Sequence, residues 1–320
     1  SNDPPPTDTN TVYKSSAASD VYKRQPIRSL RQRVQQASGG FPRRVMKPTR
    51  ILLPINSHGT TATCSDVAFG LARRFEAELE VLHPCPPPSQ RLPYATELSP
   101  VYFEAYLDVS KKQVEYEEKQ AVAWFEKVAA KWDDVESQLL TVEGLVGPAV
   151  AQRAKTADFS VLPTVSAADD EMFGEARDAA LFSSGRPALF VPDEAGGHVG
   201  ETVVIAWKDS VEAARAVAAA APFLEGARRV RLISLVPDGE PDDETAVAMA
   251  NYLKAACLPV ELTSVPLRAR YVCDAILEEA GSGVLLVMGG YGRWRWQEWV
   301  FGGATDYVLR NTDIAVLMSH

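Results

Sequence analysis

The chain has 320 residues, a formal net charge of −9 at pH 7, 46% hydrophobic residues and 23% charged residues. This composition is typical of a globular protein, and the length exceeds that of one hydrophobic core, so two domains are expected. The acidic balance argues against general binding of nucleic acid, and no uninterrupted apolar run reaches the about 18 residues of a membrane span. We therefore expect a cytoplasmic protein with no nucleic-acid or membrane partner.

Residues 1–45 are polar and low in apolar content, and they carry eight basic and three acidic residues. Such a composition is typical of a disordered segment. Because Met46 directly precedes the first apolar run, we interpret residues 1–45 as a disordered leader or as a segment foreign to the native protein. An organelle-targeting peptide is the alternative, since such peptides are rich in Arg and poor in acidic residues.

The sequence offers no metal site and no catalytic motif. The four cysteines, Cys64, Cys85, Cys257 and Cys273, have no CxxC spacing and lie in segments that otherwise read as core. We expect them to be buried, reduced thiols. The four histidines are far apart in the sequence, and the motifs of serine hydrolases, P-loop nucleotide hydrolases and zinc proteases do not occur in it. No catalytic residue and no metal ligand is therefore assigned.

Between residues 50 and 191, short apolar runs alternate with helical patterns. Strands are expected at 51–55, 78–83, 135–142, 159–162 and 188–191, and helices at 68–75, from 99 or 107 to 132, at 147–156 and at 171–182. Regular alternation of strand and helix predicts a parallel sheet with helices on both faces.

The same order restarts after a short linker, residues 192–200, which is rich in Gly and acidic residues. Strands are expected at 202–206, 230–236, 260–266, 284–288 and 314–318, and helices at 211–224, 245–256, 272–280 and from Gly302 and Gly303 onward. The run ILLPINS at 51–57 matches VVIAWKDS at 203–210, and RPALFVP at 186–192 matches DIAVLMS at 313–319. We interpret this as an internal duplication, with domains at 46–195 and 200–320.

Three glycines follow the fourth strand of the second half: Gly289, then Gly292 after two residues and Gly302 after nine more. A glycine loop between a parallel strand and a helix suits phosphate groups, since glycine allows close approach to the backbone and the helix N-terminus offers unpaired N–H groups. The spacing resembles the G-x2-G-x9-G-[ST] signature of the universal stress protein family. Gly303 departs from that signature, which has Ser or Thr there, and Thr305 is the candidate to supply the missing hydroxyl.

The resemblance implies an α/β fold of two tandem five-stranded, mainly parallel sheets with helices on both faces, the adenine nucleotide alpha hydrolase-like fold of universal stress proteins. It implies that the second half binds an adenine nucleotide, ATP, ADP or AMP, with or without magnesium. In relatives the loop after the first strand faces the base or ribose, the end of the second strand contacts adenine, and the glycine loop holds the ribose and phosphates. The implied binding residues are Ala206, Trp207, Lys208, Asp209, Leu235, Met288, Gly289, Gly292, Arg293, Gly302, Gly303, Ala304 and Thr305.

Two features of the implied site concern its charges. Nucleotide-binding members usually have Asp at the position of Lys208, so this lysine either meets a phosphate or is a solvated loop residue. One interpretation of the segment between the glycines is that Arg293 and Arg295 balance phosphate charge and that an indole covers the base or a partner. For Trp294, Trp296 and Trp299 we favour the alternative that they are packing residues.

In the first half no G-x2-G spacing follows the fourth strand. Pro163 stands there instead, and acidic residues follow at 169–171. Like charges there would oppose a triphosphate. The resemblance implies that this half is a scaffold, that the last strands of the two halves pair antiparallel, and that the chain is an intramolecular pseudo-dimer, alone or in a homodimer. An interaction protein without nucleotide is the alternative function, and slow ATP hydrolysis is a third.

Overall fold

The computed structural model describes residues 47–88, 100–164, 171–196, 199–238, 243–268, 271–290 and 303–320. These ranges lie in one compact unit. The predicted leader lies outside the described residues.

The first half alternates strands and helices in the order that the sequence predicts. α2 begins where the Thr61 side chain accepts a hydrogen bond from the Cys64 N–H, and it ends at Glu76, whose φ of 56° is left-handed. The strands are β1 (Arg50–Pro54), β2 (Glu78–Cys85), β3 (Ser137–Glu143), β4 (Phe159–Pro163) and β5 (Ala188–Val191), and the helices are α2 (Ala62–Phe75), α3 (Pro100–Ala129), α4 (Val146–Ala154) and α5 (Glu171–Phe182).

The second half repeats this order with one difference from the prediction. The strands are β6 (Thr202–Trp207), β7 (Arg229–Val236), β8 (Val260–Pro266), β9 (Leu285–Gly289) and β10 (Ala315–Ser319), and the helices are α6 (Val211–Ala219), α7 (Ala221–Glu225), α8 (Glu244–Ala255), α9 (Val272–Ala280) and α10 (Gly303–Asn311). The single helix predicted over 211–224 is wrong, because it is divided at Ala220 into α6 and α7. Pro222 explains the break: it has no N–H to donate, its ring clashes with the carbonyl four residues earlier, and it is tolerated only in the first turn of the new helix.

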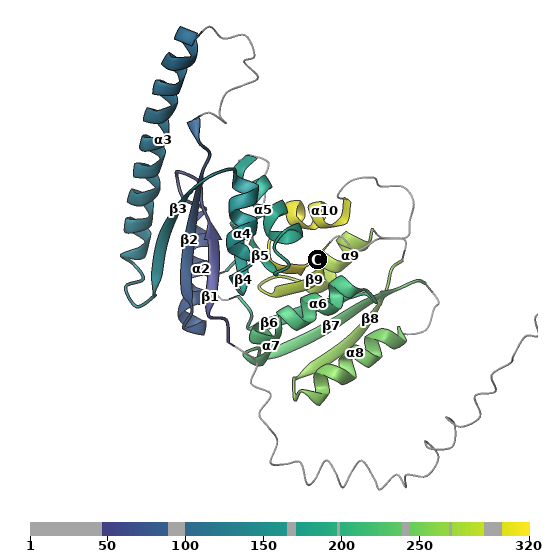
Figure 1. Cartoon of the computed structure of the whole chain (residues 1–320). Helices are drawn as coiled ribbons and strands as arrows, with labels where there is room; N and C mark the ends of the chain where they lie inside the picture. The colour runs from purple at the N-terminus through teal and green to yellow at the C-terminus, as the bar shows by residue number, and fades with distance from the viewer. Residues whose placement is uncertain are drawn as a thin grey trace, which may run out of the picture. The chain divides into compact units, whose positions relative to one another are not determined.

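The strands named above form one continuous sheet, in the order β3-β2-β1-β4-β5-β10-β9-β6-β7-β8 (Figure 1). Neighbours are parallel except β5 and β10, which pair antiparallel with Leu189 opposite Leu317. The predicted antiparallel pairing of the last strands is confirmed, and it joins the two five-stranded sheets edge to edge. Pairing two sheet edges satisfies backbone groups that each half would otherwise expose.

Helices cover both faces of this sheet. One face packs against α2, α3, α6, α7 and α8, with Phe69 and Phe223 among the buried side chains. The other face packs against α4, α5, α9 and α10, with Val150 and Val308 among them. Each core contains buried residues of both halves, so the halves share two continuous hydrophobic cores.

Arg74 of the first half contacts the second half. The Arg74 Nη1 group of α2 donates a hydrogen bond to the Val199 carbonyl at 2.9 Å. A Cβ at Gly226 would lie 2.4 Å from Arg74 Nη2, so the glycine leaves room for the guanidinium. Next to it the rings of Phe75 and Phe223 meet edge to face at 5.4 Å. The contact between halves therefore extends well beyond the β5–β10 pair.

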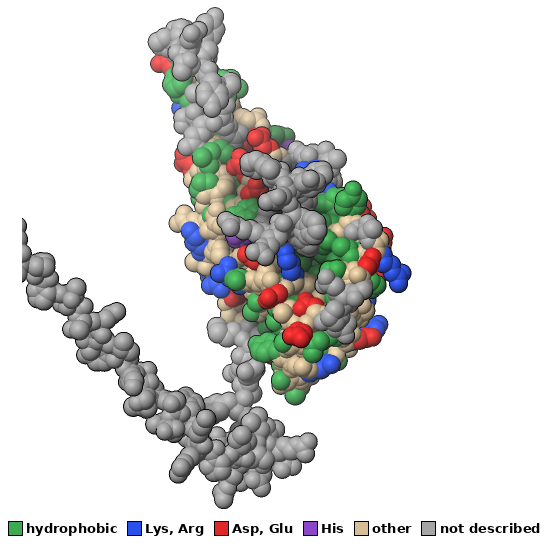
Figure 2. Space-filling model, turned by 90° about the vertical axis from the view of Figure 1, so that its right-hand side faces the viewer, with side chains coloured by type: hydrophobic (Ala, Val, Ile, Leu, Met, Phe, Trp, Pro, Cys, Tyr) green, Lys and Arg blue, Asp and Glu red, His purple; other side chains and the backbone are tan. Residues whose placement is uncertain are grey.

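The described part of the surface carries charges of both signs. Among the helices of the described residues, none is long and apolar enough to cross a membrane. On the face displayed in Figure 2, acidic, basic and apolar side chains are interspersed over the described part of the surface.

The cysteines differ in exposure, so the expectation of four buried thiols is wrong for two of them. All four are thiols rather than halves of a disulfide; Cys64 and Cys85 are buried, Cys273 is half-buried and Cys257 is exposed. Cys257 lies just after the end of α8 with a left-handed φ of 63°, in a turn that a helical pattern does not reveal. Burial raises the pKa of the Cys64 thiol to about 12.

We expect iodoacetamide at neutral pH to modify Cys257 in the native protein and to leave Cys64 unmodified until the chain is unfolded. The reason is that the thiolate is the reactive form, and Cys64 is both inaccessible and held protonated. Peptide mapping by mass spectrometry after timed labelling measures this, with Cys257→Ser as the control that removes the fast reaction. Fast labelling of Cys64 in the folded protein would contradict the packing of α2.

Candidate functional site

The strand order of the second half indicates where a ligand would bind. From β6 the chain runs outward to β7 and β8, then returns to the other side of β6 to form β9 and β10 (Figure 1). The carboxyl ends of β6 and β9 therefore form a topological switch point, which is where open α/β sheets bind ligands. Ala206 and Trp207, expected in the loop after the first strand of this half, are the last two residues of β6, and the loop itself is 208–210. The switch point comprises residues 206–210, Leu235 and residues 288–290.

Strand register brings several of the sequence-predicted residues to this one edge. Ala206 of β6 lies opposite Met288 of β9. β6 ends at Trp207, whereas β7 continues past it to Leu235, which still pairs with Val265 of β8. Leu235 therefore lies one residue beyond the last β6–β7 pair, Trp207 with Ser234, at the carboxyl end of the sheet.

The two glycines after β9 have different surroundings. A Cβ on Gly289 would lie 2.7 Å from the backbone nitrogen of Ala213 and 2.9 Å from the carbonyl carbon and Cβ of Glu212. Both residues are in the first turn of α6. A Cβ on Gly290 would lie 3.4 Å from Leu181 Cδ2, and the Gly290 N–H donates to the Ser319 carbonyl at 2.9 Å. Gly289 is therefore required for the close packing of α6 on β9, a structural role that the spacing of the glycines did not reveal.

The loop between β6 and α6 carries charges of both signs. Ser210 caps α6, since its Oγ accepts a hydrogen bond from the Ala213 N–H at 3.1 Å. Hydrogen bonds from its own backbone N–H and from Ser210 lower the pKa of Glu212. Lys208 is half-buried, and burial lowers its pKa although Glu212 acts in the opposite direction. Asp209 is exposed. Lys208 is thus partly withdrawn from water at the edge where a ligand would lie.

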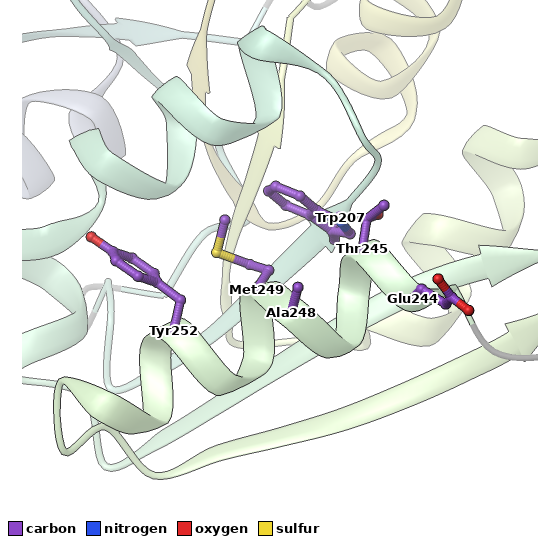
Figure 3. Close-up of a pocket in the computed structure, with 6 residues that line it drawn as sticks. All are labelled: Trp207, Glu244, Thr245, Ala248, Met249 and Tyr252. Carbon is purple, nitrogen blue, oxygen red and sulfur yellow. Dashed lines mark hydrogen bonds between the residues drawn. The ribbon is translucent and has the colours of Figure 1, made fainter. Parts of the chain in front are cut away.

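Trp207 reaches the switch point with its backbone, while its indole points to α8. The Trp207 Nε1–H donates to Thr245 Oγ1 at 3.0 Å, and Thr245 is held in turn by the Asp243 carboxylate. Burial opposes ionisation of Asp243, but hydrogen bonds from Thr245 and Ser234 outweigh it and lower its pKa. Figure 3 shows the indole beside α8, and the surrounding pocket has a volume of about 490 Å³ and is lined by Trp207, Glu244, Thr245, Ala248, Met249 and Tyr252.

α10 supplies the helix that would face a phosphate. It begins at Gly303, and the Thr305 side chain in its first turn is only 2% exposed. Only a ligand group that reaches the end of the helix itself would meet this hydroxyl. Gly292, Arg293 and Gly302 lie outside the described residues, as do Arg295 and the three tryptophans, and for Gly303 and Ala304 the structure describes the backbone alone.

The first half has different residues at the corresponding positions. Matching the registers of the two halves, Asn56 corresponds to Lys208, Pro84 to Leu235 and Pro163 to Gly289. Neither proline has an N–H, so the first half lacks the backbone N–H groups that Leu235 and Gly289 carry at these positions.

An indole also covers the first half's loop after β1. Gly59 has a φ of 94°, and a Cβ there would lie 2.1 Å from the ring of Trp124 in α3. The loop therefore packs directly beneath the indole, an arrangement that the glycine permits.

The described residues were also considered as metal ligands. Across the ranges that the structure describes, no group of three or more His, Cys, Asp or Glu side chains could hold a metal ion.

Comparison with known proteins shows similarity in structure. No family model matches the chain, and no curated protein matches it in sequence. A universal stress protein from Archaeoglobus fulgidus superposes with a TM-score of 0.60 at 16% identity, covering 84% of this chain and 94% of that one. The chain has the universal stress protein fold. Because the superposition covers 84% of the chain, it includes parts of both halves.

Two shorter structures with the universal stress protein name cover about half of the chain. The universal stress protein UspA from Lactobacillus plantarum covers 45% of this chain and 96% of its own, with a TM-score of 0.35 and 14% identity. A universal stress protein in complex with cAMP covers 45% of this chain and 97% of its own, with a TM-score of 0.31 and 15% identity.

Proposed function

We propose that this chain is a tandem universal stress protein that binds an adenine nucleotide at the switch point of its second half. The observation that carries the proposal is the convergence of the β6 loop, Leu235 and the Gly289–Gly290 turn at one carboxyl-terminal edge, with α10 starting after the glycine loop. Parallel sheets bind nucleotides at such edges because helix N-termini there offer N–H donors to anions.

The residues present fit a nucleotide in three parts. The backbone of Leu235, past the end of β6, would hydrogen-bond the adenine edge. The end of β6 and the loop after it, residues 206–209, would face the ribose. The N–H groups at Gly303 and Ala304, with the glycine loop, would hold the phosphates through the partial positive charge of the α10 N-terminus.

Lys208 takes the place of the usual acid and changes the charge of the site. A half-buried ammonium group interacts with an anion more strongly than a solvated one, because less water screens the charge. It would act as a point charge toward a phosphate. A magnesium ion would then depend on the phosphates of the nucleotide, with Asp209 as the nearest carboxylate of the loop in sequence.

The first half would act as the structural partner in an intramolecular pseudo-dimer, residues 46–195 joined to residues 200–320. Pro84 and Pro163 support this role, because they remove backbone donors where the second half has them. The β5–β10 pairing occupies the edge through which two separate units would otherwise associate. A further dimer of two chains is compatible with this arrangement, since β3 and β8 remain as sheet edges.

A nucleotide-free interaction protein is the second candidate. The apolar pocket of Figure 3 favours it, since Met249 and Tyr252 line the pocket on α8, and Tyr252 is 57% exposed. Val247 on α8 and Val211 at the start of α6 are further exposed apolar residues. Apolar groups gathered on a surface commonly mark contacts with other proteins.

Nucleotide released by denaturing the purified protein and identified by mass spectrometry tests the proposal, together with calorimetric titrations of ATP, ADP and AMP. We expect binding by the unaltered chain and its loss in Gly292→Val, because a branched side chain would fill the glycine loop. Gly147→Ala in α4 is the matched control, since a Cβ there meets no atom within 4 Å.

Binding that persists unchanged in Gly292→Val would move the nucleotide away from the glycine loop. An unaltered chain that carries no nucleotide and takes up none at millimolar concentration would reject the proposal in favour of the interaction protein.

A further inference from the structure

One face of α5, in the first half, lies along the edge of the second half's site. Leu181 Cδ2 would be 3.4 Å from a Cβ on Gly290, directly after β9. Four residues earlier on the same helix, Arg177 Nη1 lies 3.3 Å from Asp306 Oδ1 in α10. Because residues four apart share a helix face, the same side of α5 contacts both the glycine turn and α10.

Asp306 is shared between two arginines from different halves. Arg310, one turn later in α10, donates from Nε to Asp306 Oδ2 at 2.7 Å. Arg177 reaches the other carboxylate oxygen from the first half, and its side chain is only 14% exposed, against 44% for Arg310. Arg177 also pairs with its exposed neighbour Asp178 at 3.2 Å. The more buried of the two cations on Asp306 is therefore supplied by the half that lacks the glycine loop.

The position of Asp306 makes this neutralisation relevant to an anion. Asp306 lies in the first turn of α10, at the end of the helix where unpaired N–H groups attract negative charge. A carboxylate there stabilises the helix by itself, but it repels a second anion that approaches the same end. A phosphate at the start of α10 would meet this repulsion unless the carboxylate is neutralised.

We propose that Arg177 is a positioning residue for the phosphates of a nucleotide bound to the second half. It neutralises Asp306 and holds the start of α10 against the first half, so that the helix end accepts a di- or triphosphate. This rests on the proposed function and deepens it: the first half tunes which nucleotide is bound, as well as supporting the fold.

Binding of ATP and AMP to the full chain separates this role from a structural one. Arg177→Met is expected to weaken ATP binding by roughly threefold to tenfold and AMP binding by about twofold at most, because the repulsion from Asp306 grows with the charge of the phosphate chain. Arg177→Lys keeps a positive charge and should retain most of the ATP affinity. Arg186→Met, an exposed arginine between α5 and β5, is the control for loss of a charge from the first half.

The rescue is the decisive measurement. In Arg177→Met, Asp306 keeps Arg310 as its only arginine partner of the two. Adding Asp306→Asn removes the carboxylate charge that Arg177 no longer offsets, so the double variant should bind ATP as well as Asp306→Asn alone. If Arg177→Met loses ATP binding because it unfolds, the double variant does not regain binding. Thermal unfolding of each variant is therefore measured alongside binding. A structural role alone would lower ATP and AMP binding equally and would not be reversed by Asp306→Asn.

The outcomes distinguish the two proposals. If the unaltered chain binds ATP and Arg177→Met binds it equally well, the role of Arg177 is overturned and the nucleotide site stands. Equal losses for ATP and AMP, or failure of the double variant to recover, overturn it as well. If the unaltered chain binds no adenine nucleotide, the proposed function fails and this inference fails with it.

Discussion

Arg153→Met is expected to lower the free energy of unfolding by about 3–5 kcal/mol, because it leaves a buried carboxylate without its partner. Glu80 in β2 is 1% exposed. Arg153 of α4 donates to both of its oxygens, from Nε to Oε1 at 2.6 Å and from Nη2 to Oε2. Such a bidentate pair stabilises chiefly by keeping the buried charge satisfied. Urea unfolding followed by circular dichroism measures the loss.

The same strand provides a matched control. Glu78, two residues before Glu80, pairs with Arg50 at 2.9 Å, but both side chains are partly exposed, at 24% and 36%. Arg50→Met should therefore cost no more than about 1 kcal/mol. The double change of Glu80→Leu with Arg153→Met should be milder than Arg153→Met alone, since no charge is then left in the core. Equal costs for the Arg153 and Arg50 variants would show that water reaches Glu80 and that α4 packs less tightly than described.

Gly289→Ala is expected to destabilise the protein by about 1–3 kcal/mol, as overpacking does elsewhere, and to weaken nucleotide binding at the proposed site. The added methyl group would lie 2.7 Å from the backbone nitrogen of Ala213, and backbone cannot yield as a flexible side chain does. The start of α6, together with the loop at 208–210 before it, would have to move away from β9. Thermal unfolding and ATP titration of the same sample report the two effects.

Gly290→Ala is the control variant, since it adds a methyl group to the same turn. In Gly290→Ala the new Cβ would lie 3.4 Å from the end of the Leu181 side chain, which can rotate away. We expect a stability change below about 1 kcal/mol, since Gly290 is not in a left-handed conformation. If both variants are equally stable, the contact between Gly289 and α6 is looser than the structure shows, and the role assigned to Gly289 in packing fails.

Local patterns in the sequence were sufficient for the elements and their alternation. The runs at 188–191, 260–266 and 272–280 coincide with β5, β8 and α9 to the residue. They did so because apolar periodicity, glycines and prolines act within a few residues of where they stand. The one divided helix, α6 and α7, also had a local cause in Pro222, which the alanine-rich pattern around it obscured.

The sequence by itself determined the two repeated α/β units, their order, and the glycine spacing that points to an anion at the end of β9. Only the tertiary structure decided that Leu189 lies opposite Leu317 where the two units join, that Gly289 is needed by α6, and that Arg177 of one half pairs with Asp306 of the other. The reason is physical. Strand and helix signals depend on neighbours in the chain, whereas a close backbone contact or an ion pair between residues 129 positions apart depends on how distant elements pack.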